Sequence, residues 1–179
     1  LFDLVAGHTS IEHPWFRQSA NGMGNMQYTD YYIWAGPRDH FLPDKFVESN
    51  FARKGHYLKN FFDIQPALNY GYANPDPEHP WEQAMDAPGP MAVRREQMNI
   101  IAFWMDKGLD GFRCDMANSL VKNDDKQHSA NCKLWREILD WAGGQYPDGV
   151  FLSEWSNPTE AINEAGFQVD MIIHNGIGK

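Results

Sequence analysis

The chain has 179 residues, of which 42% are hydrophobic and 22% charged, a composition typical of a globular domain with a sizeable core. Its net charge of −9 argues against nucleic acid and against anionic membrane surfaces, because both need a basic face. No apolar run approaches the ~20 residues of a membrane helix. Two cysteines, Cys114 and Cys132, are too few for a disulfide framework and lack the spacing of a zinc site.

The first part of the chain predicts one strand followed by a long irregular segment. Residues 1–5 form a short apolar run typical of a buried strand. Residues 8–90 are rich in Gly, Pro, Asn, Asp and aromatic residues, and a connection of that length is unusual unless it is functional. We expect most aromatic residues here to pack together and one or two to stack on a sugar ring: Trp15, Phe16, Tyr28, Tyr31, Tyr32 and Trp34.

Beyond Pro90, helices and strands alternate. The pattern predicts helices over 93–107 and 131–142, a third helix that begins after Asn157 and ends at Gly166, and strands over 109–116, 149–155 and 169–174. Strands that alternate with helices indicate a parallel sheet. A closed (β/α)₈ barrel needs ~250 residues, so a barrel built from this chain would be only partial. A Rossmann-type binder is excluded because no Gly-rich turn follows a strand.

Functional groups of parallel α/β folds gather at the carboxyl ends of the strands. Asp115 and Glu154 occupy two such ends, and neighbouring strands lie ~4.8 Å apart. Retaining glycosidases use two carboxyl groups at ~5–5.5 Å, a nucleophile and an acid/base. Arg113 shares a strand face with Asp115 and would keep it ionised, whereas Phe151 and Trp155 could give Glu154 the apolar surroundings of an acid. The alternative is a structural Arg–Asp pair beside a solvated Glu154.

Four segments together resemble the signatures of the α-amylase family, glycoside hydrolase family 13. Residues 111–118 (GFRCDMAN) resemble its nucleophile motif, and residues 3–10 (DLVAGHTS), extended by 13–16 (HPWF), resemble its first motif. Residues 151–155 (FLSEW) resemble the acid/base motif and residues 63–69 (DIQPALN) a motif late in its inserted loop domain. Together and in order, the four motifs are highly specific and span nearly the whole chain.

The resemblance implies part of a (β/α)₈ barrel, about strands three to six, formed by residues 1–8 and 91–179, with residues 9–90 as an inserted loop subdomain. It implies Asp115 as nucleophile and Glu154 as acid/base. The substrate-binding and supporting residues that it implies are His8, Arg113 and Trp155 for the sugar and Asp3 as a structural partner of Arg113.

Two positions in this chain depart from the family pattern. Gly7 stands where the family usually has Asn, which helps to hold calcium in calcium-dependent amylases, so we expect no cofactor and no metal. We interpret Asp30, Asp39 and Asp44 as turn residues. His174-Asn175 is not the family's later catalytic aspartate motif, and strand-end packing is at least as plausible for it as a sugar contact.

The function predicted on this basis is retaining cleavage of α-glucosidic bonds in starch-like glucans or oligosaccharides. Alternatives are a transglycosylase or isomerase of the same family, and an inactive fragment or non-catalytic relative. The expected partners are a carbohydrate substrate and the remainder of the barrel, with no nucleic acid and no membrane. The compartment stays open, with a slight preference for a secreted or periplasmic location.

Overall fold

The computed structural model describes residues 1–22, 26–39 and 42–172. Contacts divide the chain into two compact units: residues 1–6 with 94–179, and residues 7–93. Each unit has a sheet of its own. These divisions fall within a few residues of the boundaries that the sequence predicts, after residues 8 and 90.

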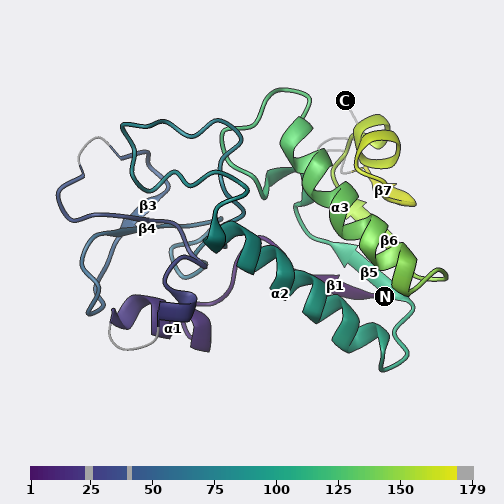
Figure 1. The fold of residues 1–179 in the computed structure, drawn as a ribbon, viewed down its shortest axis with the longest axis horizontal. Helices are drawn as coiled ribbons and strands as arrows, with labels where there is room; N and C mark the ends of the chain where they lie inside the picture. The colour runs from purple at the N-terminus through teal and green to yellow at the C-terminus, as the bar shows by residue number, and fades with distance from the viewer. Residues whose placement is uncertain (23–25, 40–41, 173–179) are drawn as a thin grey trace, which may run out of the picture. The chain divides into compact units, whose positions relative to one another are not determined.

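The first unit contains a four-stranded parallel sheet in the order β1-β5-β6-β7 (Figure 1). Its strands are β1 (Phe2–Leu4), β5 (Gly111–Cys114), β6 (Val150–Glu154) and β7 (Val169–Met171). All strand pairs are parallel and each strand neighbours the next one along the chain. The four predicted strands are therefore present, somewhat shorter than predicted, and the last two positions predicted for the fourth strand, 173 and 174, lie outside the described residues.

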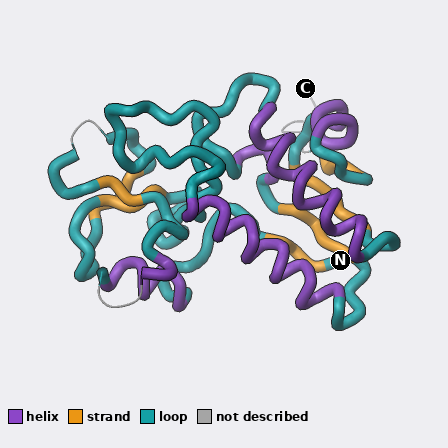
Figure 2. The backbone as a smooth tube through the Cα atoms, in the orientation of Figure 1, coloured by secondary structure: helices purple, strands orange, loops and turns teal. Residues whose placement is uncertain are grey.

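Helices connect these strands on one side of the sheet, as Figures 1 and 2 show. They are α2 (Pro88–Met105), of which residues from Arg94 onward belong to this unit, and α3 (Ser129–Gln145). The predicted end of this helix at residue 142 is wrong. Gly143 and Gly144, which follow it, face open space inside the helix, and α3 ends where the Tyr146 N–H donates to the Ala142 carbonyl. Without a left-handed glycine the backbone simply continues to Gln145.

Two shorter helical segments complete this unit. A 3₁₀ turn, η2 (Ala117–Ser119), follows β5, and a π-helical segment, η3 (Thr159–Glu164), follows β6. The predicted third helix is thus present, as a short π-helical segment. As predicted, Asn157 lies at its start and accepts a hydrogen bond from the Glu160 N–H, at 3.5 Å.

The core of this unit lies between the sheet and its helices. Alternate residues of β6, Phe151 and Ser153, are buried, whereas Leu152 and Glu154 on the opposite face are partly exposed. Phe151 stacks on Phe112 of β5 with ring centroids 6.0 Å apart. Large helix residues that are fully buried in this unit are Ile101 of α2 and Leu134, Trp135 and Ile138 of α3. Glu154 therefore lies on the face of the sheet that these helices do not cover, and functional groups can be accommodated there.

The second unit holds a helix and a small antiparallel sheet that the sequence analysis missed. The elements are α1 (Pro14–Asn21), the 3₁₀ turn η1 (Met26–Tyr28), β2 (Trp34–Ala35), β3 (Phe46–Glu48) and β4 (His56–Leu58), with strand order β2-β4-β3. The strands are too short to show alternation. Helix α1 has an unusual cap, because the Nδ1 atom of His13 accepts a hydrogen bond from the Trp15 N–H.

Aromatic side chains form the core of the second unit. Phe16, Tyr31, Tyr32 and Trp34 are each less than a tenth exposed. The Phe16 ring contacts those of Tyr32 and Trp34 at centroid distances of 5.0 and 5.7 Å. Packing is thus confirmed for these four rings, which are closed to a ligand, while Trp15 is only partly buried.

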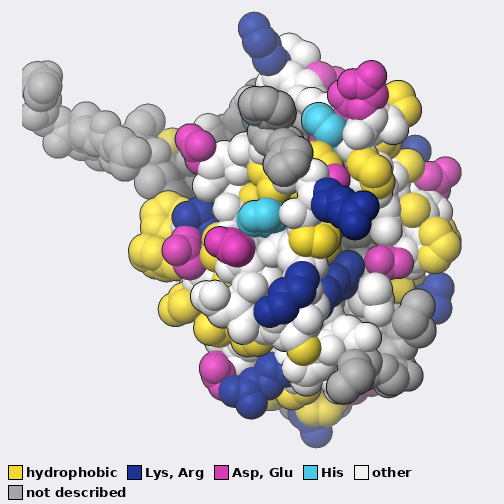
Figure 3. Space-filling model, turned by 90° about the vertical axis from the view of Figure 1, so that its left-hand side faces the viewer, with side chains coloured by type: hydrophobic (Ala, Val, Ile, Leu, Met, Phe, Trp, Pro, Cys, Tyr) yellow, Lys and Arg dark blue, Asp and Glu magenta, His cyan; other side chains and the backbone are white. Residues whose placement is uncertain are grey.

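Within the described part of the chain, no helix is both long and apolar enough to cross a bilayer. The face drawn in Figure 3 intersperses hydrophobic, acidic and basic side chains.

Candidate active site

Asp115 and Glu154 lie at the carboxyl ends of neighbouring strands. β5 and β6 pair in parallel with Cys114 opposite Ser153, so the next residue of each strand is one of the two carboxylates. The Asp115 N–H donates to the Leu4 carbonyl and extends the pairing of β5 with β1 by one residue. The strand adjacency that the sequence argument assumed is therefore confirmed.

Arg113 connects both carboxylates through one guanidinium group. Its Nη1 donates to Asp115 Oδ1 at 2.8 Å and to Asp3 Oδ1 at 3.0 Å, while Nη2 donates to Glu154 Oε2 at 2.7 Å. Burial acts to lower the pKa of the guanidinium, but the hydrogen bonds to Asp3 and Asp115 and the charge of Glu154 outweigh it and raise this pKa. Arg113 is therefore a permanent cation shared by three acidic side chains.

The site is accessible without being fully solvated. The side chains of Arg113, Asp115 and Glu154 are 26%, 22% and 18% exposed, whereas Asp3 at the edge of the cluster is 58% exposed. Ion pairs of this kind are screened less by solvent than fully exposed pairs. One guanidinium facing three carboxylates also leaves a surplus of negative charge at this end of the sheet.

Met116 contributes to the site through its backbone. Its φ of 43° lies in the left-handed region, which is uncommon for a residue other than glycine. In this conformation its N–H donates to Glu154 Oε2 at 3.0 Å. The chain reversal after β5 therefore supplies a second hydrogen-bond donor to the carboxyl group at the end of β6.

The polar surroundings of Glu154 contradict one expectation. The sequence analysis placed Phe151 and Trp155 around its carboxyl group, but odd-numbered positions of β6 face the helices and Glu154 faces the other way. Trp155 is only 3% exposed, and its indole N–H donates to Glu160. The ring has no free face for a sugar, so the structure contradicts the predicted substrate contact of Trp155.

His8 belongs to the second unit, where Asn60 orients it. The Nδ1 atom of His8 lies 3.0 Å from Asn60 Nδ2, and an amide donor there leaves the imidazole proton on Nε2. A Cβ atom at position 7 would lie 3.3 Å from the same amide, so Gly7 makes room for Asn60. Asn60 is a residue that the sequence analysis did not single out, because its partner lies 52 positions away.

The predicted turn residues lie elsewhere in this unit. Asp39 accepts a hydrogen bond from the Gly36 N–H, as a turn residue does. Among the described residues, no group of three or more His, Cys, Asp or Glu side chains is placed to hold a metal ion. His174 and Asn175 lie outside the described residues.

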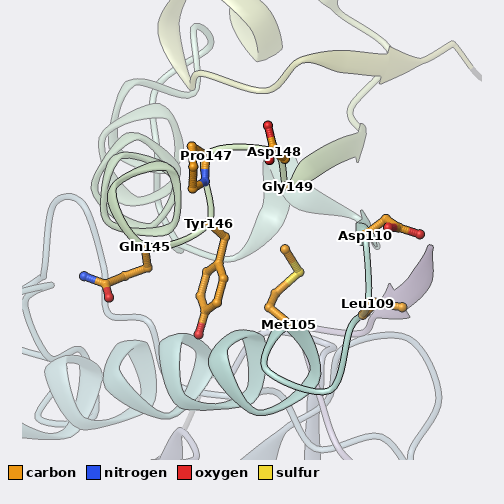
Figure 4. Close-up of a pocket in the computed structure, with 8 residues that line it drawn as sticks. All are labelled: Met105, Leu109, Asp110, Gln145, Tyr146, Pro147, Asp148 and Gly149. Carbon is orange, nitrogen blue, oxygen red and sulfur yellow. The ribbon is translucent and has the colours of Figure 1, made fainter.

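A cavity of about 270 Å³ lies at the opposite, amino end of the same strands (Figure 4). Asp110 and Gly149, which directly precede β5 and β6, line it together with Tyr146. The hydroxyl of Tyr146 donates to Asp106 at 2.8 Å. Neither Asp115 nor Glu154 lines this cavity, so it is separate from the carboxylate cluster.

Comparison with known proteins agrees with the arrangement of these residues. The family model described as "Alpha amylase, catalytic domain" matches residues 1–165. The chain is 35% identical over 161 residues to Alpha-amylase 3 of Dictyoglomus thermophilum, covering 88% of this chain and 26% of that protein. It is 30% identical over 171 residues to the trehalose synthase/amylase TreS of Mycolicibacterium smegmatis, covering 85% and 24%.

A solved structure shows the same fold. The trehalulose synthase MutB of Pseudomonas mesoacidophila aligns with a TM-score of 0.68 and 21% identity, over 95% of this chain and 33% of that one. The chain spans about a quarter of the length of the curated relatives it matches. The predicted partial (β/α)₈ barrel is thereby confirmed. This chain belongs to the α-amylase family of glycoside hydrolases and forms part of its (β/α)₈ catalytic domain.

Proposed function

We propose that this chain, within a complete barrel, cleaves α-glucosidic bonds of glucans or oligosaccharides with retention of anomeric configuration. The observation that carries the proposal is the pair Asp115 and Glu154 at the ends of adjacent strands, joined by Arg113. Adjacent strand ends suit the short carboxyl separation of retaining enzymes better than the wider gap that an attacking water needs.

In the first step, an Asp115 oxygen attacks the anomeric carbon while Glu154, in its acid form, gives a proton to the departing glycosidic oxygen. The products are a covalent glycosyl ester on Asp115 and the released sugar alcohol. In the second step, the carboxylate of Glu154 takes a proton from water, whose oxygen attacks the anomeric carbon and frees Asp115. Two inversions at one carbon give net retention.

Charge supports this assignment. The transition state of glycoside cleavage resembles an oxocarbenium ion and carries positive charge on the sugar. With Glu154 in its acid form, the carboxylates of Asp3 and Asp115 still outnumber the single guanidinium of Arg113. This negative surplus favours such a charge more in the transition state than in the neutral substrate. The Arg113 guanidinium donates a hydrogen bond to Asp115, the proposed nucleophile.

His8 is the proposed sugar-binding residue of the second unit. Asn60 lies against its Nδ1 atom and orients the imidazole. The partly buried ring of Trp15 is an aromatic candidate for a sugar contact, since four of the six aromatic residues singled out in this segment are closed within the core.

A second candidate function is glycosyl transfer or isomerisation through the same covalent intermediate. The observation that favours it is the 30% identity with a protein named trehalose synthase/amylase. A sugar hydroxyl would replace water in the second step. Products from maltose and maltoheptaose distinguish the two, because transfer yields longer or isomerised sugars and hydrolysis yields shorter ones.

The test is Asp115→Asn in the complete enzyme. We expect kcat on maltoheptaose to fall by about 10³-fold or more, because an amide cannot form the glycosyl ester. Proton NMR of the wild-type reaction should show α-anomeric products first. Asp110→Asn, at the other end of β5, is the matched control and should keep nearly full activity. Undiminished turnover by Asp115→Asn, or β-anomeric first products, would refute the proposal.

A further inference from the structure

Trp155, the residue after Glu154, forms a hydrogen bond with each of its polar groups: the backbone N–H, the carbonyl and the indole N–H. The Trp155 backbone N–H donates to Asp170 Oδ1 at 3.1 Å, and its indole N–H donates to Glu160 Oε2 at 2.9 Å. Its carbonyl accepts a hydrogen bond from Asn118 at 3.3 Å. The side chain is buried, so these bonds form in surroundings where a missing partner is costly.

Asp170 holds both neighbours of Glu154. Besides the N–H of Trp155, its Oδ1 atom accepts the hydroxyl hydrogen of Ser153 at 2.6 Å. Asp170 lies on β7, where Met171 pairs with Glu154. One carboxylate oxygen on the neighbouring strand therefore fixes the residues on either side of Glu154, while Glu154 itself points to the opposite face of the sheet.

Glu160 links the carboxyl end of β6 to two other elements, η3 and the start of α3. Its Oε2 atom lies 2.8 Å from Nδ1 of His128, which directly precedes α3, and its own backbone belongs to η3. The Glu160 side chain is 16% exposed. The His128 ring also meets the Trp155 ring edge to face at 5.9 Å. The indole is therefore fixed by its N–H and by its ring.

In the described residues, the pairing of β6 with β7 extends as far as Glu154 and Met171. Ser156 has a φ of 64°, so the chain leaves regular strand geometry directly after Trp155. Ladder hydrogen bonds therefore end at the point where Glu154 has to be placed accurately. At this point the hydrogen bonds to Trp155 are accepted by side chains, Asp170 on β7 and Glu160 on η3.

We propose that Glu160 and Asp170 are positioning residues that act through Trp155 to fix the acid/base carboxyl of Glu154. This inference rests on the proposed function. Neither residue contacts the reacting atoms; both lie on the helix-facing side of β6. Loosening Trp155 would let Glu154 shift relative to the glycosidic oxygen, and proton transfer is sensitive to shifts of that kind.

The leaving group of the substrate makes the inference testable. Departure of a sugar alcohol needs a proton from Glu154, whereas a dinitrophenolate leaves without one. A fault in the position of Glu154 therefore lowers kcat/KM for maltoheptaose and spares kcat/KM for a dinitrophenyl α-glucoside. General damage to the fold or to the nucleophile lowers both.

The variants are Glu160→Ala and Trp155→Phe, each of which removes one partner of the same hydrogen bond, in the complete enzyme. We expect kcat/KM for maltoheptaose to fall about tenfold or more and that for the dinitrophenyl substrate to change less than about twofold. Glu160→Gln should stay near wild type, because its amide oxygen still accepts the indole N–H. Glu164→Ala, one turn along the same segment, is the matched control and should behave as wild type.

Equal losses on both substrates, or no loss on either, in both Glu160→Ala and Trp155→Phe would overturn the positioning role. Glu154→Ala separates this failure from failure of the proposed function. If Glu154→Ala shows the leaving-group pattern and the other two variants do not, only the positioning inference is wrong. If Glu154→Ala lacks the pattern, Glu154 is not the acid/base, and the positioning inference falls with it.

Discussion

Arg113 is the residue on which the geometry of the cluster depends most. A guanidinium is planar and directs several N–H donors in fixed directions, so one side chain can serve Asp3, Asp115 and Glu154 at once. A lysine ammonium could carry the same charge, but its three N–H donors radiate from one nitrogen and cannot span the same set of acceptors. The arrangement therefore uses the shape of arginine in addition to its charge.

Arg113→Lys should lower kcat/KM for maltoheptaose about 10²-fold in the complete enzyme, because Lys cannot bridge Asp115 and Glu154 at the observed distances. Steady-state kinetics measures this, with thermal unfolding as a check on folding. Arg94→Lys is the control, since Arg94 pairs with Glu137 between α2 and α3, outside the carboxylate cluster, and lysine keeps the positive charge beside Glu137. Activity should therefore change little. Activity of Arg113→Lys close to that of Arg94→Lys would contradict this account.

Among the elements, β5 depends on a glycine at its first position. Gly111 has a φ of 149°, and a Cβ atom there would overlap the Val150 carbonyl oxygen of the neighbouring strand. The close approach of β5 and β6 that aligns Asp115 with Glu154 therefore requires the absence of a side chain. The glycine of the segment GFRCD serves the pairing of strands.

Gly111→Ala should lower the free energy of unfolding by about 3 kcal/mol or more, since neither backbone can retreat without breaking the ladder. Urea unfolding of the complete protein measures the change. Gly144→Ala provides the comparison, because this glycine lies inside α3 with open space around it and alanine there should stabilise by up to about 1 kcal/mol. Similar stabilities for the two variants would rule out the close-approach argument.

For the molecule as a whole, the sheet of the first unit has two open edges. β1 and β7 each pair with one strand only in the described structure, and apolar side chains are exposed beside them. These are Leu1, Phe2, Val169 and Ile172, with exposures from 43% to 59%. Unpaired strand edges beside apolar side chains favour association with further strands.

The 179-residue chain, prepared by itself, should therefore self-associate. Light scattering coupled to size-exclusion chromatography should show a mass that rises with protein concentration, while the complete barrel enzyme stays at constant mass over the same range. A monodisperse monomer of the isolated chain that unfolds cooperatively would show that the edges are protected in another way.

Much of this architecture can be read from the amino-acid order alone. The apolar strands around Phe112 and Phe151, the intervening helices and the residues at the strand ends follow from local periodicity and from the rule that parallel strands share a functional edge. Asp115, Glu154 and Arg113 came from that rule. Motif spacing then indicated the family, which the comparisons confirmed.

Other features depend on contacts between distant positions. The short strands β2, β3 and β4 have too few residues to show a period, and the bonds of Asp170 to Ser153 and of Asn60 to His8 join residues 17 and 52 positions apart. The inward or outward direction of Trp155 likewise depended on the register of β6. Local sequence carries no signal for such pairs, because folding alone brings the partners together and decides which polar groups of a buried strand end they must satisfy.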